Sequence, residues 1–229
     1  MIRVATYNVH RSVGRDGRGD PLRVARVVEE VNPDVLALQE VAYRHGERGH
    51  LLDLLAEALG AQVVEGMTLE DPRGHYGNAL VSRLPIRELS HVNISVPRRE
   101  PRGAIEALLD AGGQTLQVVA THLGLRPMER RHQVRALLRV VDASDASTKV
   151  LLGDLNEWFL LGRPIRWLQR AFEETRALPT FPSRRPLFAL DRCWVSPSAS
   201  LSRLYVHDSS LARLASDHLP LVADLRLPE

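Results

Sequence analysis

The feature of this sequence that most constrains its fold is a series of short apolar segments, each of strand length, separated by turn-rich loops and by a few helices. Apolar runs this short, bounded by turn residues, are typical of buried β-strands. Strands that alternate with helices in this way predict an α/β fold. The strand candidates are IRVATYN (2–8), DVLALQE (34–40), NALVS (78–82), IEALLD (105–110), TLQVVATHL (115–123), KVLLGDLN (149–156), ALDRCWVS (189–196) and HLPLVADLRL (218–227).

Three helices are predicted by capping residues and by apolar side chains that recur at helical spacing. Asp20 and Pro21 begin the first helix, Gly60 ends the second, and Pro127 begins the third. The apolar faces consist of Val24, Val27, Val28 and Val31 in the first helix, Leu51, Leu54, Leu55 and Ala58 in the second, and Val134, Leu137, Leu138 and Val141 in the third.

Four irregular stretches, 11–20, 65–77, 97–103 and 178–187, are rich in Gly, Pro and Arg. They are expected to be loops, any of which is suited to lie over a site. None has the composition of an interdomain linker, so one domain over residues 1–229 is expected.

Composition narrows the class of protein. The single cysteine, Cys193, excludes an internal disulfide and a multi-cysteine zinc site. The first residues lack the pattern of a signal peptide, and no apolar run is long enough to cross a bilayer, so a cytoplasmic protein without a transmembrane segment is expected. The net charge is only +2, Lys149 is the only lysine, and no basic run marks a nucleic-acid-binding arm.

Several strand candidates end in a polar residue that is suited to chemistry. Asn8, Glu40, His122 and Asp154 each end an apolar run, and Asn156 follows two residues after Asp154. A polar side chain at the end of a buried run needs a partner or water. One such residue is usually a cap or a turn former. Four of them favour a shared site, because sites assemble at strand ends in layered α/β folds.

The segment SDHLPL (216–221) opens the last strand candidate with a polar triplet. If this strand runs antiparallel to its neighbours, its start lies beside their ends, so Asp217 and His218 join the same group. Asp191 shares a strand face with apolar residues and needs a partner, for which a histidine is suited. Ser216 is expected to be a turn or hydrogen-bonding group and not a nucleophile, because adjacent residues on a strand point to opposite faces.

The chain lacks the motifs G-x-S-x-G, H-E-x-x-H, G-x-x-x-x-G-K-[ST] and G-x-G-x-x-G. What remains is a set of carboxylates and amides with two histidines. Oxygen ligands of this kind suit a hard cation such as Mg²⁺. A histidine backed by a carboxylate suits general acid–base catalysis or the stabilisation of negative charge. Together these residues indicate metal-assisted hydrolysis of a phosphate ester.

Seven segments then suggest a family. They are TYNVH (6–10), LQE (38–40), GNALVSRLPI (77–86), THL (121–123), GDLN (153–156), LDRCWV (190–195) and SDHLPL (216–221). In these segments, and in their order, the chain resembles the endonuclease/exonuclease/phosphatase superfamily, which includes pancreatic-type DNases, AP endonucleases, bacterial sphingomyelinases and inositol polyphosphate phosphatases. THL or LQE alone is a weak signal, whereas GDLN followed by SDHLP is specific, and the resemblance spans nearly the whole chain.

The resemblance implies a four-layer α/β sandwich. Two mixed, mostly antiparallel sheets pack face to face with helices outside, and the site lies at one edge, where strand ends from both sheets meet. It also implies a metal centre. Glu40 would be the main ligand of Mg²⁺ or Mn²⁺, with Asn8 beside it and Asp217 as a second or alternate ligand.

The catalytic roles also come from the resemblance. Asp154 would orient or deprotonate the attacking water, and Asn156 would hold that water or a phosphate oxygen. His218 would contact the phosphate and stabilise charge in the transition state, with Asp191 fixing its tautomer. His122 occupies a position that touches the phosphate in other members.

Two further residues are candidates for substrate binding. Asn78 is either a substrate contact or a brace for the site, and Arg102 is either a phosphate contact or a solvated loop arginine. The segment LGLRPMERRHQ (123–133) resembles small bacterial members, and its Arg130 and Gln133 are expected to brace the loop after His122.

The chain departs from the nuclease pattern in three respects. His10 stands where many nuclease members carry an aspartate, which favours a one-metal site centred on Glu40. AP endonucleases carry a tyrosine in place of His122, so an AP-site activity is disfavoured. The chain also lacks room for the extra hairpins of membrane-lytic sphingomyelinases.

Three functions follow from these observations. The first is a metal-dependent phosphodiesterase that acts on a phospholipid head group or a small phosphodiester. The second is a DNA or RNA nuclease, for which scattered arginines would supply phosphate contacts. However, aromatic residues make up only 5% of the chain, which leaves few stacking platforms for single strands. The third is a catalytically silent binding module on the same fold. No obligate protein partner is evident.

Overall fold

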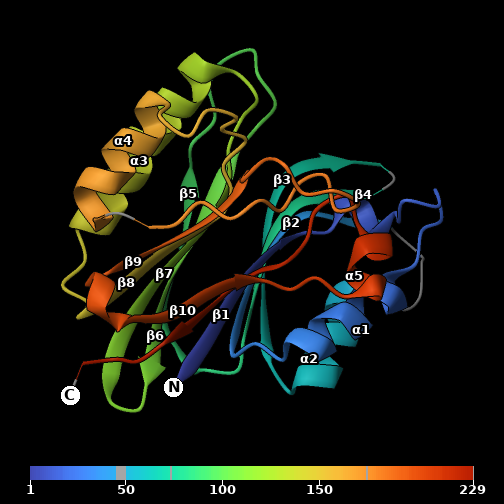
Figure 1. Cartoon of the computed structure of the whole chain (residues 1–229), viewed down its shortest axis with the longest axis horizontal. Helices are drawn as coiled ribbons and strands as arrows, with labels where there is room; N and C mark the ends of the chain where they lie inside the picture. The colour runs from blue at the N-terminus through green and yellow to red at the C-terminus, as the bar shows by residue number, and fades with distance from the viewer. Residues whose placement is uncertain (45–49, 73, 174, 229) are drawn as a thin grey trace.

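The computed structural model describes residues 1–44, 50–72, 74–173 and 175–228. Two β-sheets pack face to face, with helices on both outer sides (Figure 1). The six-stranded sheet has the order β10-β11-β1-β2-β4-β3 and the five-stranded sheet the order β5-β6-β7-β8-β9. The strands are β1 (Ile2–Asn8), β2 (Val35–Arg44), β3 (Gln62–Asp71), β4 (Gly74–Ser82), β5 (Ile86–Asn93), β6 (Gly103–Ala111), β7 (Gln114–His122), β8 (Thr148–Asp154), β9 (Asp191–Ser196), β10 (Leu201–Val206) and β11 (Leu221–Leu225).

The helices form the two outer layers of the sandwich (Figure 1). The six-stranded sheet is covered by α1 (Pro21–Val31), α2 (Leu51–Leu59) and α5 (Ser210–Ala215). The five-stranded sheet is covered by α3 (Pro127–Asp142) and α4 (Arg163–Phe172). The predicted four-layer α/β sandwich is therefore confirmed. No helix in the described part of the chain combines the length and the apolar character that crossing a bilayer requires.

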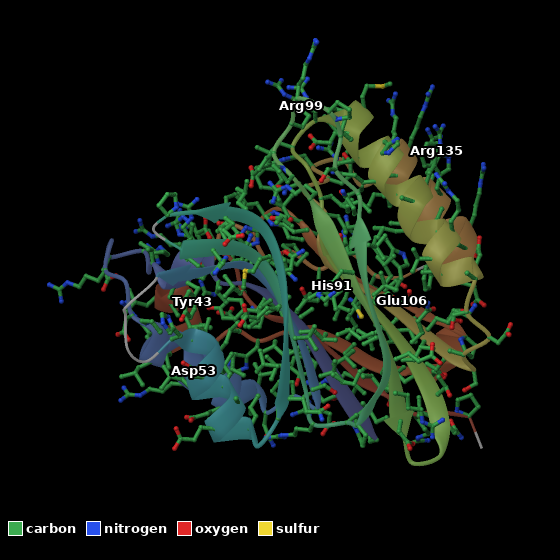
Figure 2. The ribbon with its side chains drawn as sticks, turned by 180° about the vertical axis from the view of Figure 1, so that it is seen from behind. Tyr43, Asp53, His91, Arg99, Glu106 and Arg135 are labelled. Carbon is green, nitrogen blue, oxygen red and sulfur yellow. The ribbon has the colours of Figure 1, made fainter. Side chains whose placement is uncertain are left out.

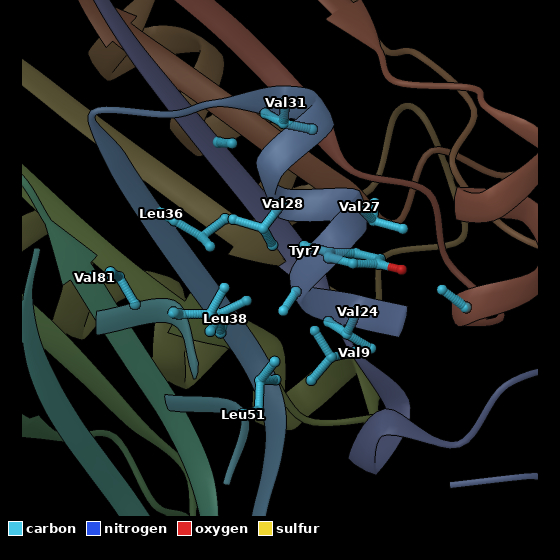
Figure 3. Packing of buried hydrophobic residues seen from close by; sticks show 14 of the residues in the cluster. Tyr7, Val9, Val24, Val27, Val28, Val31, Leu36, Leu38, Leu51 and Val81 are labelled. Atoms are coloured by element: carbon cyan, nitrogen blue, oxygen red, sulfur yellow. The ribbon is translucent and has the colours of Figure 1, made fainter. Parts of the chain in front are cut away.

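Apolar layers between the two sheets and between each sheet and its helices hold the sandwich together. Between the sheets, Val4 and Leu80 from the first sheet pack with Val118 and Val150 from the second. Outside the six-stranded sheet, side chains of β1 and β2, including Tyr7, lie under α1 (Figure 3). Each sheet alternates its side chains between two buried faces, which is why its central strands are apolar nearly throughout.

The three predicted helices are present at the predicted capping residues. The Asp20 carboxylate caps α1 by accepting a hydrogen bond of 3.0 Å from the backbone N–H of Arg23. Gly60 ends α2 with a φ of 58°, a left-handed conformation that glycine adopts without a Cβ clash. Pro127 begins α3. The expected loop over 65–77 is wrong: β3 and β4 form a hairpin there.

The strand directions bring the polar strand ends to one edge of the sandwich. β7 and β8 are parallel, and β11 pairs antiparallel with β1, as predicted, with Leu221 opposite Thr6. The last strand begins at Leu221, however, so Asp217 and His218 lie in the loop before β11 and not in the strand itself.

Candidate active site

Polar side chains from both sheets meet where β1, β7 and β8 end. β1 ends at Asn8, and the last residues of β7 and β8, His122 and Asp154, are partners in register. β9 begins at Asp191, which pairs with Asp154 across the antiparallel β8–β9 ladder. All four side chains are buried. The structure therefore brings together residues that are far apart in the sequence, and their polar groups must satisfy one another.

Glu40 reaches this group from a bulge in β2. The predicted strand does not end at Glu40, because β2 continues to Arg44 with a register shift between Leu38 and Val41. Glu40 itself has a φ of 58°. A non-glycine residue pays about 1–3 kcal/mol for such a conformation, and positions of this kind cluster at functional sites. The bulge brings the Glu40 carboxylate to the end of β1.

Asn8 links two carboxylates through its amide nitrogen. Its Nδ2 donates to Glu40 Oε1 at 3.1 Å and to Asp154 Oδ2 at 3.0 Å, and its Oδ1 accepts from the backbone N–H of His10 at 3.1 Å. The amide thus holds the carboxylates at a fixed spacing, with its oxygen turned to the backbone. That Asn8 is itself a metal ligand stays a prediction.

Local contacts explain why the GDLN segment (153–156) has glycine, aspartate and asparagine at these positions. Gly153 has a φ of 147°, and a Cβ there would lie 1.9 Å from the carbonyl oxygen of Thr121, so only glycine lets β8 approach β7 this closely. Asp154 Oδ1 accepts a hydrogen bond of 2.9 Å from the backbone N–H of Asn156. Asn156 has a φ of 49° and donates from Nδ2 to the carbonyl of Leu123 at 3.0 Å.

His122 is held between Arg102 and Asp154. Arg102 Nη1 lies 3.0 Å from His122 Nδ1. A guanidinium can only donate, so Nδ1 accepts and Nε2 carries the ring hydrogen. With this tautomer the Nε2–H faces Asp154 Oδ2 at 3.5 Å. The 3.0 Å approach of Asn156 Nδ2 to Nε2 is then a close contact between two donors and not a hydrogen bond, because Nδ2 donates to the carbonyl of Leu123. Burial, with the charge of Arg102, lowers the pKa of His122 to about 3 despite the nearby Asp154 carboxylate, so this imidazole is neutral at pH 7.

The alternative that Arg102 is a solvated loop arginine is wrong. Its side chain is buried, and besides His122 it pairs with Glu100 Oε2 at 3.2 Å. The fixed cation sets the tautomer of His122. Its role as a direct phosphate contact stays a prediction.

His218 is held in the opposite protonation state by Asp191. His218 Nδ1 lies 2.7 Å from Asp191 Oδ2, and the same oxygen accepts from Thr180 Oγ1 at 2.6 Å. Burial alone would lower the pKa of His218, but the carboxylates of Asp191, Asp154 and Asp217 raise it to about 10. His218 is therefore an imidazolium at pH 7, and its Nε2 lies 3.8 Å from Asp154 Oδ2.

Asn78 and Asp217 lie at the margins of this group. Asn78 is buried and donates from Nδ2 to the carbonyl of Gly103 at 3.0 Å, so it braces β4 against β6, one of its two expected roles. The half-exposed Asp217 carboxylate lies 4.0 Å from His10 Nδ1. Ser216 donates to the carbonyl of Asn8 at 2.8 Å and fixes this loop to β1, which agrees with its expected role as a hydrogen-bonding group.

Sequence reasoning missed a buried ion pair beside the site. Arg130 Nε lies 3.1 Å from Glu157 Oε2, and both side chains are at most 4% exposed. Arg130 Nη1 also donates to the carbonyl of Leu125 at 2.7 Å, and Gln133 Oε1 accepts from the N–H of Gly124 at 2.9 Å. Arg130 and Gln133 thus brace the loop after His122 as expected. The signal for Glu157 was its place directly after Asn156.

We expect Glu157→Gln to lower the free energy of unfolding by about 3–5 kcal/mol, because it leaves the buried guanidinium of Arg130 without its counter-charge. Chemical denaturation monitored by circular dichroism measures this change. Asp16→Asn, which breaks a pair of 2.9 Å with Arg23 in which the Asp16 side chain is 33% exposed, is the control, and we expect a much smaller loss because solvent screens the exposed carboxylate. Equal losses in the two variants would contradict the importance of burial.

The residues at this edge fit a divalent cation. Glu40 is a carboxylate with partial solvent exposure, and only its Oε1 is hydrogen-bonded within the described residues. Asp154, Asp191 and His218 also present ligand-type atoms within 4.8 Å of one another. In that buried group, Asp191 and His218 already form an ion pair, and an imidazolium has no lone pair for a metal. The donor chemistry therefore favours Glu40 as the centre of a metal site.

The sequence of this chain is similar to known sequences over nearly its whole length. The family model described as "Endonuclease/Exonuclease/phosphatase family" matches residues 5–218. The protein YbhP of Escherichia coli K12 is 31% identical over 246 aligned positions, which cover 99% of this chain and 96% of YbhP.

Solved structures are similar over the same length. An endonuclease/exonuclease/phosphatase from Beutenbergia cavernae matches with a TM-score of 0.80 and 26% identity, over 99% of this chain and 71% of that one. The human Nocturnin catalytic domain, solved with a bound sulfate anion, matches with a TM-score of 0.76 and 20% identity, over 99% and 94% of the two chains. At that identity the second match supports the fold alone.

Proposed function

Because the chain belongs to the endonuclease/exonuclease/phosphatase family, whose members are phosphoesterase and nuclease hydrolases, we propose that it is a divalent-metal-dependent phosphodiesterase. Water attacks the phosphorus in line with the leaving oxygen. The substrate class that we favour is a phospholipid head group or another small phosphodiester. The observation that carries the proposal is the arrangement around Asp154. Asn8 links the Asp154 carboxylate to that of Glu40, and two histidines in opposite protonation states direct their Nε2 atoms toward Asp154.

Asp154 is the residue that we assign to the attacking water. Its Oδ1 accepts from the backbone of Asn156, and its Oδ2 accepts from Asn8 and faces both histidine Nε2 atoms. A carboxylate held at both oxygens has one orientation, which suits it to position a water molecule and to accept its proton.

The two histidines have complementary tasks in this proposal. His218, held by Asp191, directs a charged N–H toward the reacting phosphate and stabilises the negative charge that develops there. Neutral His122 donates from Nε2 without adding charge, and its orientation is set by Arg102. Asn156 holds the water or a phosphate oxygen.

Glu40, with Asp217 as a second ligand, would hold Mg²⁺ or Mn²⁺. The bound ion supplies Lewis-acid polarisation of the phosphoryl oxygen. In this assignment Asn8 keeps the Glu40 carboxylate at its spacing from Asp154, so that substrate phosphate held near Glu40 also lies near the attacking water.

The test of the proposed function compares bis-(p-nitrophenyl) phosphate with p-nitrophenyl phosphate. We expect cleavage of the diester with Mg²⁺ or Mn²⁺, none with EDTA, and slower cleavage of the monoester, followed at the absorbance of p-nitrophenolate. Cleavage of the monoester alone would move the assignment to a phosphatase. No turnover of either compound would favour the silent binding module.

A nuclease is the second candidate, because exposed arginines such as Arg98, Arg99 and Arg126 lie in loops at the same edge. Oligonucleotides offered in the same assay distinguish it. Phosphate contacts of this kind predict cleavage that falls steeply as the salt concentration rises.

A further inference from the structure

Apolar side chains are exposed beside the candidate active site, in a loop that the catalytic assignment does not use. Phe159, Leu160 and Leu161 are 69%, 59% and 76% exposed, and Trp158 before them is 44% exposed. Four consecutive large apolar residues on a surface are unusual in a protein that contacts only water. The segment 158–161 begins two residues after Asn156, so it leaves from the edge of the sandwich that carries the site.

Two neighbouring loops add to this apolar surface. β7 and β8 are parallel and their ends are in register, so the loops that follow them leave the same edge. The loop after β7 carries Leu125, which is 62% exposed, and the first turn of α3 after it carries Met128, which is 70% exposed. The second loop carries Leu187, which is 71% exposed, and Phe188 after it. The ring of Phe188 packs on that of Trp158, with ring centroids 4.8 Å apart.

The loop is held in a fixed place relative to the site. Trp158 also contacts Phe181 edge-on at 5.9 Å, and Phe181 in turn contacts the His218 ring at 4.8 Å. On its other side, the backbone N–H of Phe159 lies 3.3 Å from Glu157, the partner of buried Arg130. The apolar side chains therefore project from a braced loop, in contact through two aromatic rings with the imidazolium.

The surface around these side chains is basic. A groove of about 320 Å³ lies along α4 and is lined by Arg163, Arg166, Trp167 and Arg170. The guanidinium of Arg135 on α3 lies 4.7 Å from the Trp167 ring. Figure 2 shows Arg135 projecting from α3 and Arg99 projecting from the loop after β5.

Acidic groups do not neutralise this surface. In the described segments 96–102, 125–131, 158–170 and 181–188, Glu100 is the only exposed acidic side chain. Glu129 in the same segments is buried. Within the described residues, the exposed arginines of these segments form no ion pairs with carboxylates. They are Arg98, Arg99, Arg126, Arg163, Arg166, Arg170, Arg184 and Arg185.

We propose that segment 158–161, with Leu125, Met128, Leu187 and the surrounding arginines, is a docking surface for an anionic lipid bilayer. Exposed Phe and Leu side chains enter the interfacial region of a bilayer, where burial of apolar area is favourable, and arginines beside them are attracted to lipid phosphates. A nucleic acid would account for the arginines, but it offers no apolar environment to Leu160 and Leu161. A bilayer accounts for both.

Docking in this way turns the candidate active site toward the lipid surface. That the substrate is then a phosphodiester of a membrane lipid rests on the proposed function, whereas the docking itself does not. Vesicle binding therefore tests the docking, and hydrolysis of the soluble diester, measured on the same preparations, tests the chemistry.

The experiment is cosedimentation of the full chain with vesicles of phosphatidylcholine alone and of phosphatidylcholine with 30 mol% phosphatidylglycerol, a composition of about one anionic lipid in three. We expect binding to the anionic vesicles, weaker binding to the neutral ones, and release at high salt. Phe159→Ser, Leu160→Ser and Leu161→Ser together should lower the partition coefficient by at least about tenfold. Arg163→Glu with Arg166→Glu should lower it by a similar factor.

Matched controls come from exposed residues outside the proposed docking surface. Leu22→Ser with Leu89→Ser removes exposed apolar side chains from α1 and β5, and Arg26→Glu with Arg226→Glu reverses exposed charges on α1 and after β11. We expect both controls to bind vesicles as the original chain does. Quenching of tryptophan emission by brominated lipids, lost in the serine triple variant, would show that segment 158–161 enters the bilayer.

Three results would overturn the proposal. The first is the absence of binding to anionic vesicles at low salt. The second is binding that the serine triple variant retains in full. The third is binding of oligonucleotides that depends on Arg163 and Arg166 but not on Phe159, Leu160 and Leu161, which would assign the surface to nucleic acid instead. Vesicle binding without hydrolysis of the soluble diester would leave the docking intact and remove the proposed reaction.

Discussion

Replacing Asp154 with asparagine is expected to lower kcat for the diester by about a factor of 10³, the size of effect that loss of a general base produces. Asparagine has nearly the shape of aspartate, and its oxygen still accepts one of the hydrogen bonds that Asn8 and the backbone of Asn156 donate. The change removes the negative charge at the point that Asn8 and both histidines face. We expect circular dichroism spectra and melting curves close to those of the original chain, so that the loss reports chemistry and not folding.

Asp224→Asn is the matched control for this variant. Asp224 is also buried, and its Oδ1 accepts from Arg3 Nε at 2.7 Å, but it lies on β11 opposite the start of β1, at the far end of the sandwich. This substitution should lower stability and leave kcat unchanged. An Asp154→Asn enzyme that kept most of its activity would remove Asp154 from the role assigned to it, whatever the metal dependence.

The central strands of both sheets could be predicted from the sequence because they are buried on both faces. IRVATYN and KVLLGDLN are nearly continuous apolar runs, and they form β1 and β8. The three missed strands, β3, β5 and β10, all lie at sheet edges. An edge strand exposes more of its length, as β5 does at most of its positions, so its apolar pattern is weak.

The strand-end pattern also predicted which polar residues would meet, since parallel strands with polar C-terminal ends place them together. It did not predict how they pair. That Asn8 bridges two carboxylates with its nitrogen, and that Arg102 is buried against His122, depends on contacts between residues distant in the sequence. The bulge at Glu40 is likewise set by the β2–β4 pairing and has no local sequence signal.

The second large effect is expected at His218. His218→Ala should lower kcat by about 10²–10³-fold, because it removes a charged donor at the point where negative charge develops. Asp191→Asn should have a similar effect, since the amide no longer holds the ring as an imidazolium through the 2.7 Å contact at Nδ1. For both variants we expect a larger change in kcat than in KM.

The double variant separates positioning from direct catalysis. If Asp191 acts only through His218, then Asp191→Asn in the His218→Ala background should cost almost nothing further, and the two effects will be strongly non-additive. Thr180→Val is the control: it removes a donor to Asp191 but keeps the Asp191–His218 contact, so we expect a loss of only about fivefold. Effects of Asp191→Asn and His218→Ala that simply multiplied would mean that Asp191 contacts the substrate or the metal itself. The buried group of Asp154, Asp191 and His218 would then be the better candidate for the metal site than Glu40.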